Sequence, residues 1–141
     1  MRILGLDLGT KTLGVAISDK SGVLAVPLSL IKFKNEDYNE ALEELLKIIN
    51  EHDIKTVVLG LPKNMDGTLG FAAKRSINFK NMLEERNINV VLEDERLTSV
   101  SAINILKDNG KKNIKSQEKT DIISAELILD SYLKRIHNER M

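Results

Sequence analysis

A single carboxylate inside an apolar run near the start of the chain constrains the fold more than any other feature. Residues 3–8 are apolar apart from a glycine and Asp7, which is typical of a strand covered on both faces. Gly9 and Gly14 bracket the short polar turn that follows, and a second apolar run begins at Val15. We therefore predict a β-hairpin whose first strand is central in a sheet and carries an acid beside the turn.

The predicted position of Asp7 is compatible with two roles. An unpaired charge buried in a strand costs several kcal/mol or forces protonation, so an acid is tolerated there when a cation or a donor-rich loop lies on it. Asp7 either binds such a cation or accepts hydrogen bonds from the turn amides of residues 9–11. The strand pattern does not distinguish the two.

Composition limits the class of protein. The chain has 141 residues, of which 42% are hydrophobic and 30% are charged, as expected for a single domain spanning residues 1–141. The 21 basic and 21 acidic residues give a net charge of zero, which argues against coating nucleic acid by bulk charge but not against a local basic patch. The sequence contains no cysteine, which excludes disulfides and thiolate metal sites.

The patterns of secreted and membrane proteins are also missing from the sequence. No basic-then-apolar signal segment opens the chain, and no apolar run approaches the ~18–20 residues that span a bilayer. We expect a cytoplasmic protein without a membrane partner. Its oligomeric state, monomer or homodimer, stays open.

Periodicity along the chain predicts a mixed α/β domain. After the hairpin we expect strands at residues 23–31, 56–61 and 88–92, helices at 37–51, 70–86, 98–110 and 120–136, and a basic loop at 111–119. A meander followed by βα crossovers gives a mixed five-stranded sheet with helices on both faces. On the second of these helices, the side chain of Phe71 is expected to be buried. Strands one, four and five are then parallel. Their carboxyl ends bring Asp7, the loop after Pro62, Asp94 and Glu95 to one edge, where ligands bind in such sheets.

Three acids follow one another at the end of the fifth predicted strand. Side chains alternate along a strand, so Glu93 and Glu95 share one face while Asp94 points away. Crowded like charges are unfavourable unless a cation relieves them, which points to a metal ion. The alternative is a solvated strand end with Arg96 as the counter-ion.

The last predicted helix places one acid on its sheet-facing side. At ~100° per residue, Asp121 falls within an apolar stripe whose other members are Ala125, Ile128, Leu129, Tyr132 and Ile136. Asp130 falls on the opposite, solvent side. Besides a role at the sheet, Asp121 could supply a favourable charge at the helix N-terminus or cap the helix together with Thr120, and both alternatives stay open.

Elimination leaves a small set of acids. Asp19 is expected to serve its own turn. Asp66 is less easily set aside, because its loop opens at the same sheet edge, and local backbone bonding within an Asn-Met-Asp-Gly turn is the alternative for it. The sequence contains no Ser-His-Asp grouping, Walker loop, dinucleotide fingerprint or cysteine pair. Asp7, Glu95 and Asp121 remain as an all-oxygen set suited to Mg²⁺ or Mn²⁺.

Five segments, in order along nearly the whole chain, resemble the signatures of the YqgF/RuvX family. They are residues 7–11 (DLGTK), 14–19 (GVAISD), 60–68 (GLPKNMDGT), 94–98 (DERLT) and 121–125 (DIISA). The resemblance implies an RNase H-like fold and a nuclease, a hydrolase assigned to 5′ maturation of precursor 16S rRNA in ribosome biogenesis. The family is also described as a Holliday-junction resolvase, and its acids map onto Asp7, Glu95 and Asp121.

The chain departs from the family pattern at two positions. The turn of the family carries Lys-Arg, whereas here Lys11 is followed by Thr12, so a phosphate contact of that arginine is not carried over. Ser124 stands where the family has alanine, a small-for-small change. In addition, the second acid, Glu95, follows the fifth strand, whereas RNase H-like nucleases at large take it from the fourth.

These residues together predict metal-assisted phosphodiester hydrolysis. The carboxylates would hold one or two divalent ions, ~3.5–4 Å apart if there are two. The side chains expected to contact phosphates are Lys11, Lys63, Asn64, Arg96, Lys111, Lys112, Lys115 and Lys119. For the lysine-rich segment, a merely solvated loop is the alternative.

Three further functions are compatible with the same residues. A resolvase-like DNA endonuclease would act on branched DNA, and a non-catalytic RNA-binding assembly factor would keep the fold without cleavage. ATP binding is the third, because residues 7–10 (DLGT) also resemble the first phosphate motif of actin-like ATPases and sugar kinases. Those proteins need two such domains, and 141 residues supply one.

Overall fold

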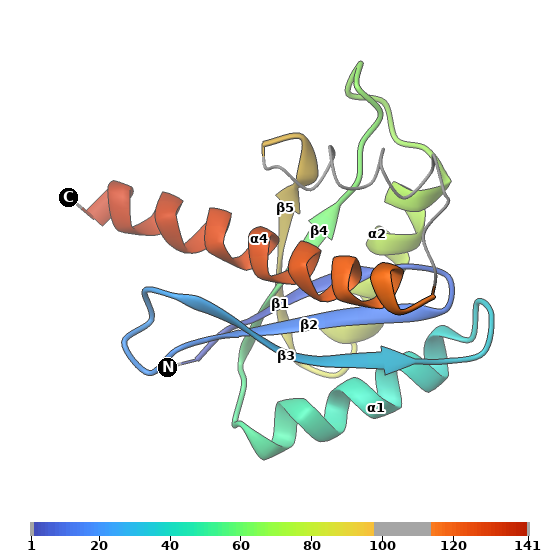
Figure 1. The fold of residues 1–141 in the computed structure, drawn as a ribbon, viewed down its shortest axis with the longest axis horizontal. Helices are drawn as coiled ribbons and strands as arrows, with labels where there is room; N and C mark the ends of the chain where they lie inside the picture. The colour runs from blue at the N-terminus through green and yellow to red at the C-terminus, as the bar shows by residue number, and fades with distance from the viewer. Residues whose placement is uncertain (1, 98–113, 141) are drawn as a thin grey trace.

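A computed structural model describes residues 2–97 and 114–140 of the chain. Five strands form one mixed sheet in the order β3-β2-β1-β4-β5 (Figure 1). The strands are β1 (Leu4–Leu8), β2 (Thr12–Ser18), β3 (Ala25–Lys32), β4 (Thr56–Leu61) and β5 (Asn89–Asp94). β2 pairs antiparallel with both β1 and β3, whereas β1, β4 and β5 are parallel. The predicted α/β class and mixed five-stranded sheet are confirmed.

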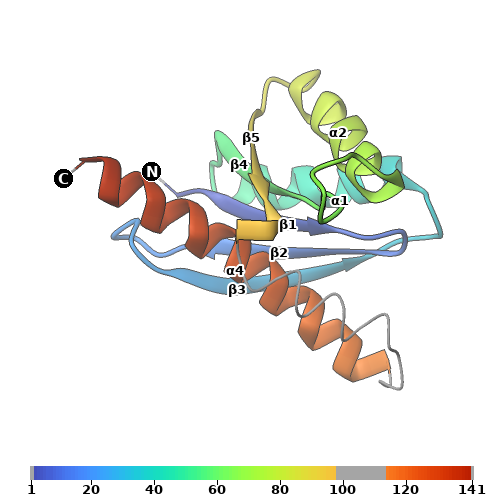
Figure 2. The same cartoon turned by 90° about the horizontal axis from the view of Figure 1, so that it is seen from above.

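Helices cover both faces of this sheet (Figure 2). α1 (Tyr38–Glu51) and α2 (Phe71–Glu84) pack on one face, and α4 (Ile114–Arg140) crosses the other. Alternation along β1 explains the division, since Leu4, Leu6 and Leu8 belong to the core under α1 and α2. Gly5 and Asp7 therefore face α4. In the described part of the chain, no helix is both long and apolar enough to cross a membrane.

Local signals explain α1 better than α2. Asp37 caps α1 by accepting a hydrogen bond from the backbone N–H of Glu40 at 3.1 Å, and the helix buries a regular apolar face. α2 begins after Gly70, which offers no side chain for a cap. Phe71, expected inside α2, is 89% exposed. That prediction was wrong: Phe71, the first residue of the helix, stays outside the core to which Phe79 and Leu83 later in the same helix belong.

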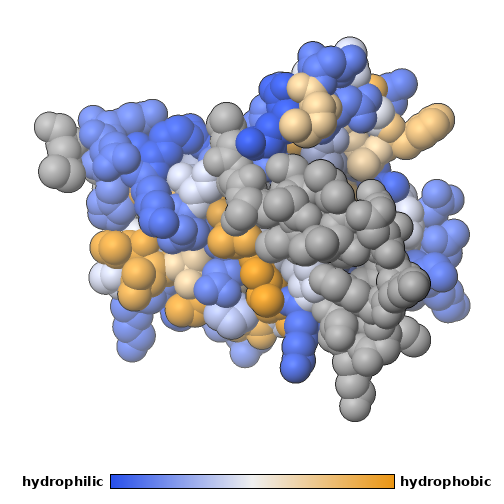
Figure 3. Space-filling view, turned by 45° about the horizontal axis from the view of Figure 1, so that its top comes forward, coloured by the Kyte–Doolittle hydropathy of each residue, from blue (hydrophilic) through white to orange (hydrophobic). Residues whose placement is uncertain are grey.

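The exposed large apolar side chains of the described residues fall mainly in two stretches, 23–26 and 65–71. On the face drawn in Figure 3, apolar side chains gather in separate areas among hydrophilic ones. Scattered exposure of this kind is ordinary for a globular protein.

The start of α4 differs most from the prediction. The helix begins at Ile114 rather than at residue 120, so Lys115 and Lys119 lie on a helix and not in a basic loop. Lys, Gln and Glu are good helix formers even without apolar periodicity, which explains the error. Asp121 is therefore inside the helix, and neither N-terminal placement nor capping with Thr120 accounts for it. The helix predicted at 98–110 lies outside the described residues.

Candidate active site

Asp7 lies on the central strand between two glycines of the neighbouring strands. It is paired with Gly14 of β2. On the other side, β1 and β4 are paired as far as Leu6 and Leu59, and the next residue on each strand is Asp7 and Gly60. Directly paired residues point to the same face of a sheet, so the half-buried Asp7 carboxylate faces α4 with a glycine on each neighbouring strand.

α4 brings Asp121 onto this position. A Cβ atom added to Gly14 would collide with the carbonyl oxygen of Asp121 and would lie 2.9 Å from its carbonyl carbon. Only glycine lets the helix backbone approach the sheet so closely. The side chain of Asp121 accepts a hydrogen bond from Thr12 Oγ1 at 3.0 Å. Asp121 thus lies over the residue paired with Asp7.

Glu95 arrives from the other side of β1. It is the first residue of the short 3₁₀ helix η1 (Glu95–Leu97), directly after β5, and it is only 3% exposed. Its Cγ and Cδ atoms lie 3.3 Å from the position of a Cβ on Gly60. Glu95 therefore covers the glycine that flanks Asp7. Three elements distant in sequence bring the three predicted acids to one face of the sheet.

The donor chemistry of these acids fits a hard cation, because carboxylate oxygens are the ligands that Mg²⁺ and Mn²⁺ prefer. The carboxylates are, however, too far apart as observed to share one ion. Among the described residues, no three His, Cys, Asp or Glu side chains are close enough to hold a metal ion together. The fold supplies the ligand type and the shared face, and side-chain rotation would have to supply the convergence.

Glu93 is the acid that the structure separates from this set. It is 2% exposed and shares the α4 side with Glu95, as predicted. Its carboxylate accepts a hydrogen bond from Ser131 at 2.9 Å and forms an ion pair with Arg135. Ser131 and Arg135 are one turn apart on α4, and sequence reasoning did not find them. The Glu93 carboxylate is therefore balanced by Arg135 and ties β5 to α4.

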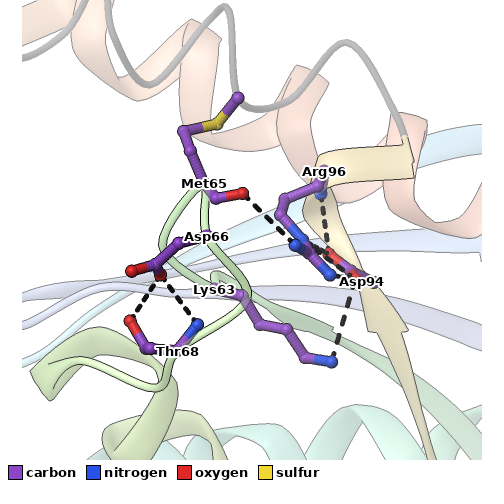
Figure 4. A network of polar contacts seen from close by, with 6 residues as sticks. All are labelled: Lys63, Met65, Asp66, Thr68, Asp94 and Arg96. Atoms are coloured by element: carbon purple, nitrogen blue, oxygen red, sulfur yellow. Dashed lines mark hydrogen bonds and ion pairs between the residues drawn. The ribbon is translucent and has the colours of Figure 1, made fainter.

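A second polar network ties the loop after β4 to the end of β5 (Figure 4). Arg96 donates to both carboxylate oxygens of Asp94 at 2.8–3.2 Å and to the Met65 carbonyl at 3.5 Å. Lys63 lies 3.9 Å from Asp94. Inside the loop, Asp66 accepts from the backbone N–H and hydroxyl of Thr68 at 3.0 and 2.7 Å. Arg96 is thus the counter-ion of Asp94. The strand end is nevertheless not solvated as the alternative required, because Glu93 and Glu95 are buried. The local role of Asp66 is confirmed.

These contacts also set the charge of the two acids. The hydrogen bond from the Arg96 guanidinium holds the pKa of Asp94 below its ordinary value, and the Thr68 hydroxyl lowers the pKa of Asp66. A lowered pKa means that the folded state favours the charged carboxylate. The loop is thus held in place by an ionised Asp94.

We expect Asp94→Asn to destabilise the protein in a pH-dependent way. Because the pKa of Asp94 is lowered in the folded state, its contribution is fully present above the unfolded value of about 3.9 and is lost as the pH falls through the folded value. Thermal unfolding of wild type and Asp94→Asn between pH 7 and pH 2.5 measures this. The difference in melting temperature between the two proteins should shrink on acidification. A constant difference would contradict the role of an ionised Asp94 in holding the loop. Asp130→Asn, whose partner Lys134 lies on the helix surface, is the control with a smaller effect.

Four of the eight residues predicted to contact phosphates lie around this sheet edge. Lys11 is exposed in the hairpin turn, and Lys63 and Asn64 lie in the loop after β4, where Asn64 bonds Thr68 at 2.9 Å. Lys119 is exposed on α4. Lys111 and Lys112 lie outside the described residues, as does the side chain of Lys115. The structure thus places Lys11, Lys63, Asn64 and Arg96 at the carboxyl ends of β1, β4 and β5.

A central hairpin, two parallel strands beyond it and a helix that brings an acid over the second strand make up an RNase H-like fold. The solved structure of T. thermophilus RuvC in complex with Holliday junction substrate has this fold, with a TM-score of 0.57 and 13% identity over 96% of each chain. Residues 1–135 match the RuvX family, described as Holliday junction resolvase, and the chain belongs to this family.

Curated relatives agree with this assignment. A protein of Aster yellows witches'-broom phytoplasma is 45% identical over 94% of this chain and 89% of its own length. One of Shouchella clausii is 44% identical over 96% of both. Each carries the name "Putative pre-16S rRNA nuclease". The family resemblance predicted from the five motifs is confirmed over nearly the whole chain.

Proposed function

We propose that this protein is a nuclease that hydrolyses phosphodiester bonds of precursor 16S rRNA during maturation of its 5′ end. The observation that carries the proposal is the placement of Asp7, Glu95 and Asp121 on one sheet face, around the two glycines that flank the central carboxylate. Family membership and the names of the relatives support the same reaction and substrate. A protein with this function would act in the cytoplasm, where bacterial ribosomal RNA is made.

The proposed ligands of Mg²⁺ or Mn²⁺ are the carboxylates of Asp7, Glu95 and Asp121. When bound, one or two such ions would lower the pKa of a water molecule and stabilise charge on the leaving oxygen. Asp7 lies on a central strand and Glu95 is buried against β4, so the fold fixes the backbone of both ligands before substrate arrives, and only their side chains would have to turn toward the ion. Lys11 and Lys63 at the same edge would orient the phosphate backbone.

A cleavage assay on two substrates tests this function. Purified protein is incubated with a precursor rRNA fragment spanning the 5′ end and with a four-way DNA junction, each with Mn²⁺ or with EDTA. We expect Mn²⁺-dependent cleavage of the RNA fragment. Cleavage of the junction alone would favour a DNA endonuclease, and RNA binding without cleavage would favour an assembly factor. Thermal stabilisation by ATP without cleavage would favour nucleotide binding.

Neutralising Lys111, Lys112 and Lys115 together is expected to weaken binding of RNA and DNA alike, because phosphate contacts carry little sequence information. For a single-stranded ligand, the slope of log affinity against log salt should become shallower by roughly 0.7 for each lost contact. Fluorescence titrations at several salt concentrations measure the slope.

The matched control removes an equal number of positive charges elsewhere, at Lys47, Lys55 and Lys80. These residues lie on α1, before β4 and on α2. This variant should keep the wild-type slope, because these lysines are far from the proposed edge. Equal slopes for all three proteins would mean that residues 111–115 are only a solvated segment.

A further inference from the structure

Thr12 reaches the proposed site from the first residue of β2. Its hydroxyl donates a hydrogen bond to Oδ2 of Asp121 at 3.0 Å, across 109 positions of sequence. The backbone of Thr12 is itself held, because its carbonyl accepts from Gly9 N–H at 2.8 Å and its Cα is paired with Lys32 of β3. A well-anchored strand residue thus contacts the carboxylate directly.

The contact with Thr12 orients the side chain of Asp121, whereas the close approach at Gly14 positions its backbone. The close approach at Gly14 sets where the helix lies, but it leaves the side-chain torsions of Asp121 undetermined. A hydrogen bond to one carboxylate oxygen selects an orientation of the whole group. Such outer partners of metal-ligating carboxylates determine how well the ligand binds.

We propose that Thr12 is the positioning residue of Asp121: its hydroxyl fixes the Asp121 carboxylate over the sheet, so that the side chains of Asp7 and Glu95 have to turn toward only one fixed ligand when a divalent ion binds. The proposal rests on the proposed nuclease function. It assigns a role to a position at which this chain departs from the Lys-Arg turn of its family.

A purely structural tie would look similar in a stability experiment, and the chain offers a matched control for it. Lys32, the strand partner of Thr12, forms an ion pair with Glu118 at 2.6 Å. Glu118 precedes Asp121 by about one helical turn. Both contacts therefore link the same part of the sheet to the same part of α4, but only the Thr12 contact involves a proposed metal ligand.

The experiment compares Thr12→Val, Thr12→Ser, Lys32→Gln and Asp121→Asn. Calorimetric Mn²⁺ titration without nucleic acid, the thermal midpoint in EDTA, and kcat and KM on the RNA fragment are measured for each. Loss of an outer-shell partner typically costs about 10–100-fold in metal affinity or activity, so Thr12→Val should raise the Mn²⁺ Kd and lower kcat by this factor. KM should change little, and Thr12→Ser should restore both quantities. Lys32→Gln should keep the wild-type Kd and kcat.

Two failures are distinguishable. If Thr12→Val keeps wild-type Mn²⁺ affinity and kcat and only loses thermal stability, as in Lys32→Gln, Thr12 is a structural tie and the proposal is overturned. If Asp121→Asn itself binds Mn²⁺ and cleaves like wild type, the proposed nuclease site is wrong. Should Thr12→Val not fold, Thr12→Ala removes the same hydroxyl with a smaller side chain and decides the question in the same way.

Discussion

Replacing Asp7 with asparagine is expected to abolish cleavage while leaving the fold intact. Asparagine keeps the shape of the side chain but removes the negative charge that a divalent ion needs. A bound ion supplies several kcal/mol of transition-state stabilisation. Loss of about 4 kcal/mol corresponds to a rate lower by about a thousandfold.

The same variant should be at least as stable as wild type without metal, because removing one of several neighbouring carboxylates lowers their mutual repulsion. Thermal unfolding in EDTA and the cleavage assay with Mn²⁺ together test this pair of expectations. Asp130→Asn is the matched control, since Asp130 lies on α4 and pairs with Lys134 at 2.8 Å. It should cleave like wild type. Retained cleavage by Asp7→Asn would remove Asp7 from the mechanism.

Replacing Gly14 with alanine should damage both stability and activity. The new Cβ would collide with the backbone carbonyl of Asp121, and a helix backbone yields less easily than the end of a flexible side chain. Overpacking of this kind typically costs about 1–3 kcal/mol. Denaturant unfolding should show a loss at the upper end of this range.

The activity of Gly14→Ala should fall even where the protein is folded. Displacing α4 moves Asp121 away from Asp7, and a shift of about 1 Å in a catalytic group can cost about a hundredfold in rate. Gly9→Ala is the control in the same hairpin, because its Cβ would find its nearest neighbours at 3.4 and 3.5 Å, an ordinary contact. If Gly14→Ala unfolds no more easily than Gly9→Ala, the helix is not seated on Gly14.

The features that the sequence determined by itself are those that depend on near neighbours in the chain. The strand predicted at 56–61 is β4 as observed, because an unbroken β-branched and apolar run ending at a proline has few alternatives. The apolar stripe of α4 was predicted from helical periodicity, and Ala125, Ile128 and Leu129 are fully buried. Asp19 serves its own turn, accepting hydrogen bonds from Ser21 and Val23. A turn acid finds its donors within a few residues.

Motif patterns also singled out Asp7, Glu95 and Asp121, but the relation between them comes from the tertiary structure. Asp7 and Asp121 are brought together because β2 pairs with β1 and α4 lies against Gly14, and no local pattern specifies that approach. The bond between Thr12 and Asp121 likewise joins residues that are independent in sequence.

The start of α4 and the exposure of Phe71 were decided in the same way. Residues 114–119 carry no periodic apolar signal, yet Lys32 of β3 forms an ion pair with Glu118 among them. Phe71 is apolar, yet it is exposed at the first residue of its helix. In both places the outcome depends on which surface another element presents, and that is settled only when the sheet and its helices have packed together.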